Sequence, residues 1–305
     1  MRKSLILGVT SLLLLSTFPA ISTAAATPQT LVIIDTGIDS AIPSIKNSVV
    51  YEVCFAGYKS CPNNAVAMEG PGAATITPAM YANKAWAHGT KVASAAIQTD
   101  PDVKIIEIRC ASLIGANGYI GCNNDLLIKA LDWTVANKTK FNIGVVISPV
   151  GNYSATCDTK VSYFEAIKRV IAAGLPIGFP SGNDFKYTGI ATPACLPGVL
   201  AISAIDDKGR LALYANYSDR VDFAAKGNLS IINAGGATVS DYGTSLSLAV
   251  FGASWLKVVN QKGLSYQATY DLFKKTGTNY TNIMVKKNVV GINLSAALEI
   301  GRAHV

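Results

Sequence analysis

Charged residues are scarce in this chain of 305 residues: they make up 15% of it, against roughly 25% in an ordinary soluble domain. Hydrophobic residues make up 50%, and this balance argues against intrinsic disorder and against a coiled coil. The formal net charge is only +7, and the basic residues do not cluster. A charge this weak and scattered does not indicate a protein that binds nucleic acid or a membrane surface.

Long hydrophobic runs are absent after the amino-terminal segment, so no later stretch is long enough to span a membrane. Near the start, two basic residues precede an apolar run at residues 5–15, and small residues follow. This pattern predicts a secretory signal peptide over residues 1–24, cut after Ala24 or Ala26. A signal anchor is the alternative, but the run is short and no basic stop-transfer segment follows. We therefore expect a secreted or periplasmic protein with no membrane contact after cleavage.

Metal ligands are also scarce. The chain has two histidines, and none of its six cysteines has the C-x₂-C spacing of zinc sites, so we predict no metal site. An even number of cysteines in an exported chain indicates disulfides. Proximity in sequence suggests Cys54–Cys61 and Cys110–Cys122, which leaves Cys157–Cys195, although six cysteines allow fifteen pairings.

Short β-branched runs alternate with helical patterns along the rest of the chain. Because these runs are continuously apolar, they are typical of parallel strands that helices cover on both faces. The expected strands are residues 31–34, 103–108, 144–147, 175–179 and 199–203, and the expected helices are residues 91–97, 126–137, 162–173, 246–259 and 266–275. Without an internal repeat or a linker, the sequence predicts one α/β domain over residues 27–298.

Three short segments carry residues with catalytic chemistry. Asp35 follows the first expected strand, so it should lie at the carboxyl edge of the sheet, where α/β proteins build their sites. His88 stands at a helix start beside Gly89, which allows close approach of another backbone segment. Ser245 follows a Gly-Thr turn and precedes the apolar helix 246–259, whose N–H groups and dipole favour an anion.

Together these residues supply the parts of an acyl-transfer site. A serine is a weak nucleophile without a base within hydrogen-bond reach, and the imidazole needs a carboxylate to fix its tautomer and stabilise its charge. Asn183, which follows the expected strand 175–179, adds an amide that can donate to an oxyanion alongside the Ser245 N–H. Each residue alone has an ordinary structural role, as a strand-end carboxylate, a helix-start histidine, a helix cap or a turn amide.

The order Asp35, His88, Ser245, within the motifs DTGID, HGT and GTS, resembles the subtilisin-like (S8) serine peptidases, and Asn183 stands at the oxyanion position of that family. Residues 194–206 and 217–227 resemble further stretches of the family. The resemblance implies an α/β three-layer sandwich with a mostly parallel central sheet. It also implies a set of substrate-binding residues along the cleft and the walls of its specificity pocket: Pro149, Val150, Gly151, Ser181 and Gly182.

We expect a monomer that acts on polypeptide substrates and requires no cofactor. Structural calcium is frequent in the family, but no run of alternating carboxylates marks a site for it. Two positions depart from the family's HGTHVAG motif: Lys91 replaces the second histidine, and Ser94 replaces the glycine. Both lie outside the proton relay, so we expect the catalytic chemistry to be retained.

The two ends of the chain carry further expectations. The short stretch between the predicted signal cut and Asp35 leaves no space for the pro-domain that such exported peptidases usually have, so we expect disulfides to support folding instead. Residues 299–305 (EIGRAHV) match the translation of a common sequencing-adapter string, so we suspect adapter read-through; the alternative is a genuine polar tail.

The sequence thus predicts a secreted serine endopeptidase. An esterase or lipase would use the same chemistry, but it should show G-x-S-x-G and the order Ser, Asp, His, and neither is present. The second alternative is a catalytically inactive subtilisin-like fold that binds extended peptides by strand addition along residues 149–151.

Overall fold

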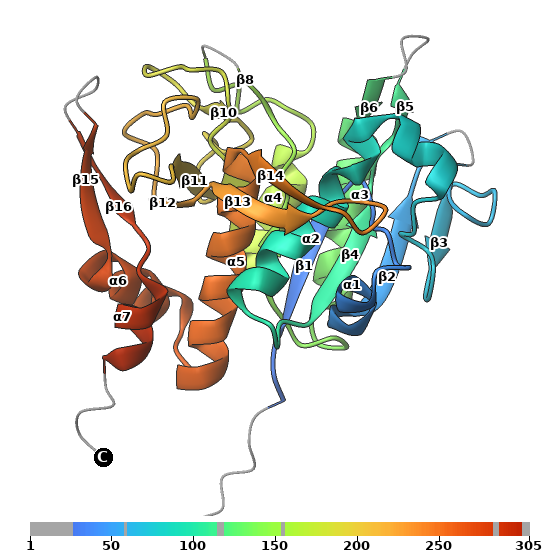
Figure 1. Cartoon of the computed structure of the whole chain (residues 1–305), viewed down its shortest axis with the longest axis horizontal. Coiled ribbons are helices and arrows are strands. Elements are labelled where there is room, and N and C mark those ends of the chain that lie inside the picture. The colour runs from blue at the N-terminus through green and yellow to red at the C-terminus, as the bar shows by residue number, and fades with distance from the viewer. Residues whose placement is uncertain (1–26, 58–59, 115–118, 154–155, 283–286, 301–305) are drawn as a thin grey trace, which may run out of the picture.

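The structure is a computed structural model that describes residues 27–57, 60–114, 119–153, 156–282 and 287–300. The predicted signal peptide and the last residues of the suspected read-through segment lie outside this part of the chain. A ten-stranded sheet crosses the molecule in the order β15-β16-β12-β11-β9-β7-β1-β4-β2-β3 (Figure 1). The two edge strands, β3 and β15, pair antiparallel with their neighbours, and the strands between them pair in parallel.

The elements have the following bounds. The strands of the large sheet are β1 (Thr30–Asp35), β2 (Val49–Phe55), β3 (Ala67–Glu69), β4 (Ile105–Arg109), β7 (Ile143–Ile147), β9 (Ile177–Pro180), β11 (Leu200–Ile205), β12 (Phe223–Lys226), β15 (Thr278–Asn282) and β16 (Lys287–Gly291). Three antiparallel pairs lie outside it: β5 (Ser112–Ile114) with β6 (Tyr119–Gly121), β8 (Asn152–Tyr153) with β10 (Ala191–Thr192), and β13 (Asn228–Ile232) with β14 (Thr238–Tyr242). The helices are α1 (Pro43–Ser48), α2 (His88–Thr99), α3 (Asn124–Asn137), α4 (Phe164–Ala172), α5 (Thr244–Lys262), α6 (Tyr266–Thr276) and α7 (Leu294–Glu299), with 3₁₀ turns at Pro78–Ala82 and Lys84–Ala87.

Helices cover both faces of the sheet. Alternate side chains of β1 point to opposite faces: Leu31 and Ile33 pack with α2 and α5, whereas Val32 and Ile34 pack with α3 and α4. Because both faces are buried, the central strands read as continuous apolar runs. The predicted three-layer α/β sandwich with a mostly parallel central sheet is therefore confirmed.

Every expected strand and helix has a counterpart, with ends that differ by at most a few residues. The fourth expected strand, for instance, begins at Ile177 rather than at residue 175. As expected, α4 ends before Gly174, whose φ of 74° suits the residue after a helix end. The sequence did not predict β2, β12 or β16, because polar or small residues interrupt the apolar pattern in each of them.

All six cysteines form disulfides, in the pairing that proximity in sequence suggested: Cys54–Cys61, Cys110–Cys122 and Cys157–Cys195. The second disulfide joins Cys110, before β5, to Cys122, after β6, and so closes the base of this hairpin. The third ties the segment after β8 to the segment after β10. Two of the three disulfides therefore support loops at the carboxyl edge of the sheet.

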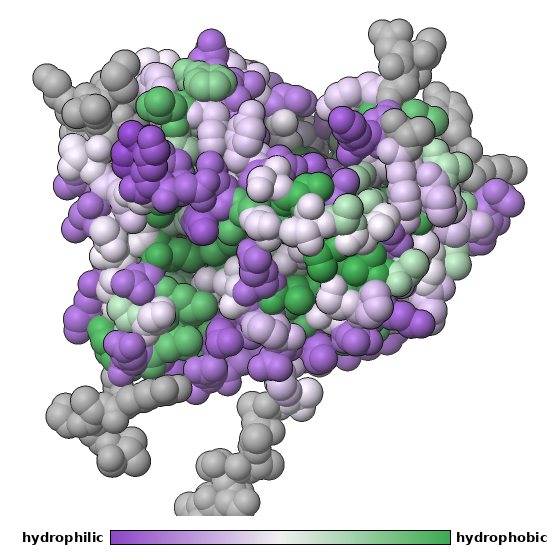
Figure 2. Space-filling model, in the orientation of Figure 1, coloured by the Kyte–Doolittle hydropathy of each residue, from purple (hydrophilic) through white to green (hydrophobic). Residues whose placement is uncertain are grey.

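Within the described part of the chain, no helix is both long and apolar enough to cross a bilayer. On the face shown in Figure 2, hydrophilic residues interrupt the hydrophobic ones, of which several gather where α6 and α7 lie. Over the same described residues, no three His, Cys, Asp or Glu side chains come together as a set of metal ligands.

Candidate active site

Asp35 and His88 meet at the carboxyl edge of the sheet. Asp35 ends β1, and His88 begins α2. The imidazole Nδ1 lies 2.8 Å from Oδ1 and 2.9 Å from Oδ2 of the Asp35 carboxylate. The backbone N–H of Thr36 also donates to Oδ1, at 2.6 Å. Asp35 is buried, whereas the His88 side chain is 33% exposed, so the carboxylate fixes the ring from behind while its other nitrogen remains accessible.

Two glycines bring these residues together. Gly37, in the turn after Asp35, has a φ of 98°, which other residues rarely adopt. A Cβ added to Gly89, next to His88, would lie 2.3 Å from the carbonyl oxygen of Gly37. The close approach predicted for Gly89 is therefore confirmed, and any larger residue there would separate α2 from the turn.

Ser245 lies in the first turn of α5, as predicted. The helix is enclosed along most of its length, with Leu246, Phe251 and Trp255 all buried. Ser245 itself is only partly buried. Its hydroxyl makes no hydrogen bond to a residue that the structure describes, and catalytic hydrogen bonds are often completed only when substrate binds.

Asn183 is anchored by the residue before the serine. Its Oδ1 accepts hydrogen bonds from the backbone N–H of Thr244, at 2.9 Å, and from the Thr244 hydroxyl, at 3.0 Å. No acceptor among the described residues takes the Asn183 amide N–H groups. The Asn183 amide nitrogen and the Ser245 backbone nitrogen both lie near Gly243, since a Cβ added to that glycine would be 3.6 Å from the first and 3.9 Å from the second.

One cleft joins the four residues. A pocket of about 360 Å³ is lined by Asp35 and His88 together with Tyr119, Ile120 and residues 149–152. A second pocket, of about 240 Å³, is lined by Asn183 and Ser245 together with Tyr153 and Ala191. Pro149, Gly151 and Asn152 line both pockets, so the two are halves of one continuous cleft.

The predicted substrate-binding residues do not all reach this cleft. Pro149, Val150 and Gly151 line it from the loop between β7 and β8, and Gly182 lines it beside Asn183. Ser181, in contrast, is fully buried, and its hydroxyl donates to Ser203 on the neighbouring strand. Ser181 thus lies in the core beside β11, because its backbone N–H also donates to the carbonyl of Ile202 on that strand.

The sequence also missed a residue that shapes the site. Asn216 is fully buried, and its Oδ1 accepts the backbone N–H groups of Asp184 and Lys186 at 2.9 and 3.0 Å. Its Nδ2 donates to the Asp184 carboxylate at 2.9 Å. Asn216 thus fixes the loop that carries Asn183. In the sequence, the position of Asn216 directly before residues 217–227, which resemble a stretch of the S8 family, could have indicated a role near the site.

Charges around the cleft set the proton affinity of the base. Burial lowers the pKa of His88, but the charge of Asp35 and its hydrogen bond outweigh this effect, so the pKa is raised above the ordinary value of 6.5. Lys91 opposes the rise and Asp241 adds to it. We therefore expect His88 to act as a base at neutral to alkaline pH.

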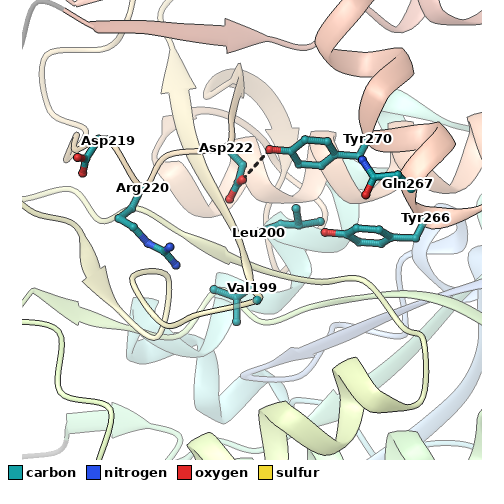
Figure 3. A pocket seen from close by; sticks show the side chains of 9 residues that line it. Val199, Leu200, Asp219, Arg220, Asp222, Tyr266, Gln267 and Tyr270 are labelled. Atoms are coloured by element: carbon teal, nitrogen blue, oxygen red, sulfur yellow. Dashed lines mark hydrogen bonds between the residues drawn. The ribbon is translucent and has the colours of Figure 1, made fainter.

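A separate pocket of about 290 Å³ lies away from these residues (Figure 3). Its lining includes Val199 and Leu200, at the amino end of β11, and Tyr266 and Tyr270 of α6. Because β9 and β11 are parallel, this is the opposite edge of the sheet from Asn183. Its central carboxylate, Asp222, accepts hydrogen bonds from the Tyr270 hydroxyl at 3.0 Å and from a backbone N–H at 2.9 Å, so it serves the packing of α6.

The fold is the one that subtilisin-like serine proteinases of known structure share. Residues 28–274 match the subtilase family, and the chain belongs to this family. The predicted family is therefore confirmed.

Several known proteins resemble the chain. The extracellular serine proteinase of a Thermus species is 27% identical over 231 residues, which cover 71% of this chain and 54% of that protein. The minor extracellular protease Epr of Bacillus subtilis is 30% identical over 101 residues, which cover 33% of this chain and 14% of that protein. The chain thus spans about half or less of the length of these relatives.

Solved structures show the same fold. A protease from Pseudoalteromonas arctica superposes with a TM-score of 0.71 at 18% sequence identity, covering 90% of this chain and 91% of that one. A cold-adapted subtilisin-like serine proteinase superposes with a TM-score of 0.65 at 16% identity, covering 86% and 87%. At these identities the likeness supports the architecture alone.

Proposed function

We propose that the protein is a secreted serine endopeptidase, in which Ser245 attacks the scissile carbonyl, His88 takes and returns the proton, and Asp35 orients His88. The observation that carries this proposal is the contact of both Asp35 oxygens with His88 Nδ1 in a cleft that also contains Ser245. With Nδ1 facing the carboxylate, Nε2 is left as the nitrogen that accepts the serine proton.

The developing oxyanion is proposed to bind the Asn183 amide and the backbone N–H of Ser245. Both donors are fixed before substrate arrives, because Thr244 holds the Asn183 oxygen and α5 holds the serine backbone. Donors that need no reorganisation stabilise the transition state more than the ground state. The partial positive charge at the N-terminus of α5 acts in the same direction.

The substrates are proposed to be polypeptides bound in extended form along Pro149, Val150 and Gly151. Pro149 and Gly151 line both halves of the cleft and Val150 lines the half beside His88, so a peptide lying against this segment would pass His88 and Ser245 in turn. Gly182 and Ala191 form part of the pocket beside Ser245, which would take the side chain before the cut.

The test is covalent labelling of Ser245 by a fluorophosphonate, combined with hydrolysis of casein and of chromogenic peptides. Wild-type protein should be labelled and active, and Ser245→Ala should be neither, with a loss of about 10⁶ in kcat. Labelling of another residue, or full activity of Ser245→Ala, would exclude the assignment. A folded protein that binds peptides without cleaving them would instead point to the inactive peptide-binding alternative.

The proposal includes secretion, a monomeric state and independence from cofactors. The triad supplies nucleophile and base without a metal, so activity should survive treatment with EDTA. Loss of thermal stability in EDTA, reversed by calcium, would reveal a structural ion. Sedimentation of the purified protein measures its oligomeric state, and its position in fractionated cultures measures its location.

A further inference from the structure

The two departures from the family motif on α2 lie on one face of that helix. Lys91 and Ser94, with Gln98, are spaced so that they follow one side of the helix. All three contact the β13–β14 hairpin, which lies across α2 in Figure 1. Ser94 Oγ accepts the backbone N–H of Ile232 at 2.9 Å, and the Gln98 amide donates to the carbonyl of Ser230 at 3.0 Å.

The third contact is an ion pair. Lys91 Nζ lies 2.6 Å from Oδ2 of Asp241, on β14, and the two side chains are 20% and 31% exposed. The other oxygen of Asp241 accepts the backbone N–H of Tyr242 at 2.8 Å. The carboxylate is therefore fixed from both sides, and the ion pair has a defined geometry.

The position of this ion pair relates it to catalysis. Lys91 lies one helical turn after His88, so both project from the first turns of α2. Asp241 lies near the end of β14, which leads through Gly243 and Thr244 directly into Ser245. The pair thus connects the element that carries the base to the segment that carries the nucleophile.

We propose that the Lys91–Asp241 ion pair is a positioning element of the active site, which fixes the first turn of α2 relative to the turn that presents Ser245. This inference rests on the proposed function, because it takes His88 as the base and Ser245 as the nucleophile. Holding two reacting groups in register is a large part of enzymatic rate enhancement, and small displacements lower the rate strongly.

Because the two residues have opposite charges, replacing each of them should shift the pKa of His88 in opposite directions. An ion pair that only stabilised the fold would not have this effect. The charged groups that act on His88 are Asp35 from β1, Lys91 from its own helix and Asp241 from β14, and the charge of Asp35 also acts on the buried Glu107 of β4. Removing Lys91 should therefore favour the protonated imidazole, and removing Asp241 should disfavour it. With both removed, the two electrostatic effects offset each other while the contact is still lost.

The experiment measures kcat/KM against pH for wild type, Lys91→Met, Asp241→Asn and the double variant. The midpoint of the acid limb of this profile should move to higher pH in Lys91→Met and to lower pH in Asp241→Asn. Each shift should be about 0.3–0.5 pH unit at low salt, and smaller in 1 M NaCl. The double variant should return to the wild-type limb. The plateau value of kcat/KM should be about 3–10-fold lower in all three variants, because kcat falls while KM stays the same.

Lys257→Met is the matched control. Lys257, on α5, pairs at 2.9 Å with Asp100, directly after the far end of α2, so it joins α2 to the helix that carries Ser245 at a point far from His88. This variant should lower the melting temperature and leave both the acid limb and the plateau unchanged. Melting temperatures of all variants show whether each is folded at the assay temperature.

Three results would overturn the inference: acid limbs that stay fixed or move in the same direction in the two single variants, an unchanged plateau in the double variant, or the same kinetic loss in Lys257→Met. A wild-type protein that no fluorophosphonate labels would instead refute the proposed function, and the positioning role with it.

Discussion

Glu107 is a carboxyl group that the proposed mechanism does not use, and its burial leads to a prediction about stability. It lies on β4, fully buried, directly opposite Glu52 of β2 in the sheet register. Neither of its side-chain oxygens makes a well-formed hydrogen bond among the described residues, although the backbone N–H of Gly37 lies close enough to oppose a rise in its pKa. Burial, followed by the charges of Asp35 and Glu52, holds the pKa of Glu107 well above its usual value of 4.5.

The sign of the pH effect follows from this shift. A group whose pKa is raised in the folded protein keeps its proton on folding, whereas the unfolded chain releases it at lower pH. The stabilising contribution is therefore complete below pH 4.5 and is lost as the pH rises through the folded pKa. Across that interval the unfolding free energy should fall by about 1.4 kcal/mol per pH unit.

Glu107→Gln removes this dependence, because a neutral amide of similar shape cannot ionise. The advantage of the variant over the parent should grow with pH, at about 1.4 kcal/mol per unit, and level off above the folded pKa of Glu107. The assay is urea unfolding between pH 5 and 8, in a Ser245→Ala background that prevents self-digestion. Glu165→Gln is the control, since Glu165 is 69% exposed and pairs with Lys168 on the surface.

The control should show no such growth. An advantage of Glu107→Gln that is independent of pH would mean that Glu107 is ionised in the folded protein throughout this range. An advantage that shrinks with rising pH would mean that the carboxylate is stabilised by the fold. Either result would refute the argument from burial and from the neighbouring charges.

Three further predictions concern the catalytic residues and the third disulfide. Asn183→Ala should lower kcat by about 10²–10³ with little change in KM, as in subtilisin, and an unchanged kcat in steady-state assays would exclude its oxyanion role. The rate constant kcat/KM should rise with pH through a single ionisation above 6.5, the ordinary pKa of histidine, because His88 must be neutral; a midpoint below 6.5 would contradict this. Replacing Cys157 and Cys195, which are 38 residues apart, with serine should lower the unfolding free energy by about 3–4 kcal/mol in denaturant titrations, and a loss under 1 kcal/mol would indicate that the unfolded chain gains no freedom.

Much of the fold and the site was predictable because their signals are local. Asp35 and His88 are each followed closely by a glycine, Gly37 and Gly89. A Cβ at Gly89 would lie only 2.3 Å from the Gly37 carbonyl oxygen, so only glycine fits there. The buried parallel strands have apolar side chains on both faces, so their pattern needs no knowledge of their neighbours. Glycines at close contacts and apolar runs in buried strands can therefore be recognised from the sequence without knowing which segments lie next to them.

The parts that escaped prediction depend on contacts between distant residues. Ser181 and Asn183 are two residues apart, yet one is buried against Ser203 and the other lies in the cleft. Asn216 holds the Asn183 loop from more than thirty positions away, since it is 32 residues from Asp184. The contact of Lys91 with Asp241 could not be predicted either, because the two residues are 150 positions apart in the chain.

The carboxylates of the central sheet show why residue type alone could not settle these roles. Asp35, Glu52 and Glu107 lie on three adjacent strands, and all three are buried. Asp35 receives the imidazole of His88 and a backbone N–H. Glu52 accepts two backbone N–H groups, at 2.9 Å each, in the loop that follows β3. Glu107 makes no well-formed hydrogen bond among the described residues, and burial outweighs the effect of the nearby Gly37 N–H on its pKa. The same chemical group thus holds a histidine, anchors a loop or has its pKa raised by burial, according to the groups that the fold places around it, and those groups come from segments that no local pattern connects.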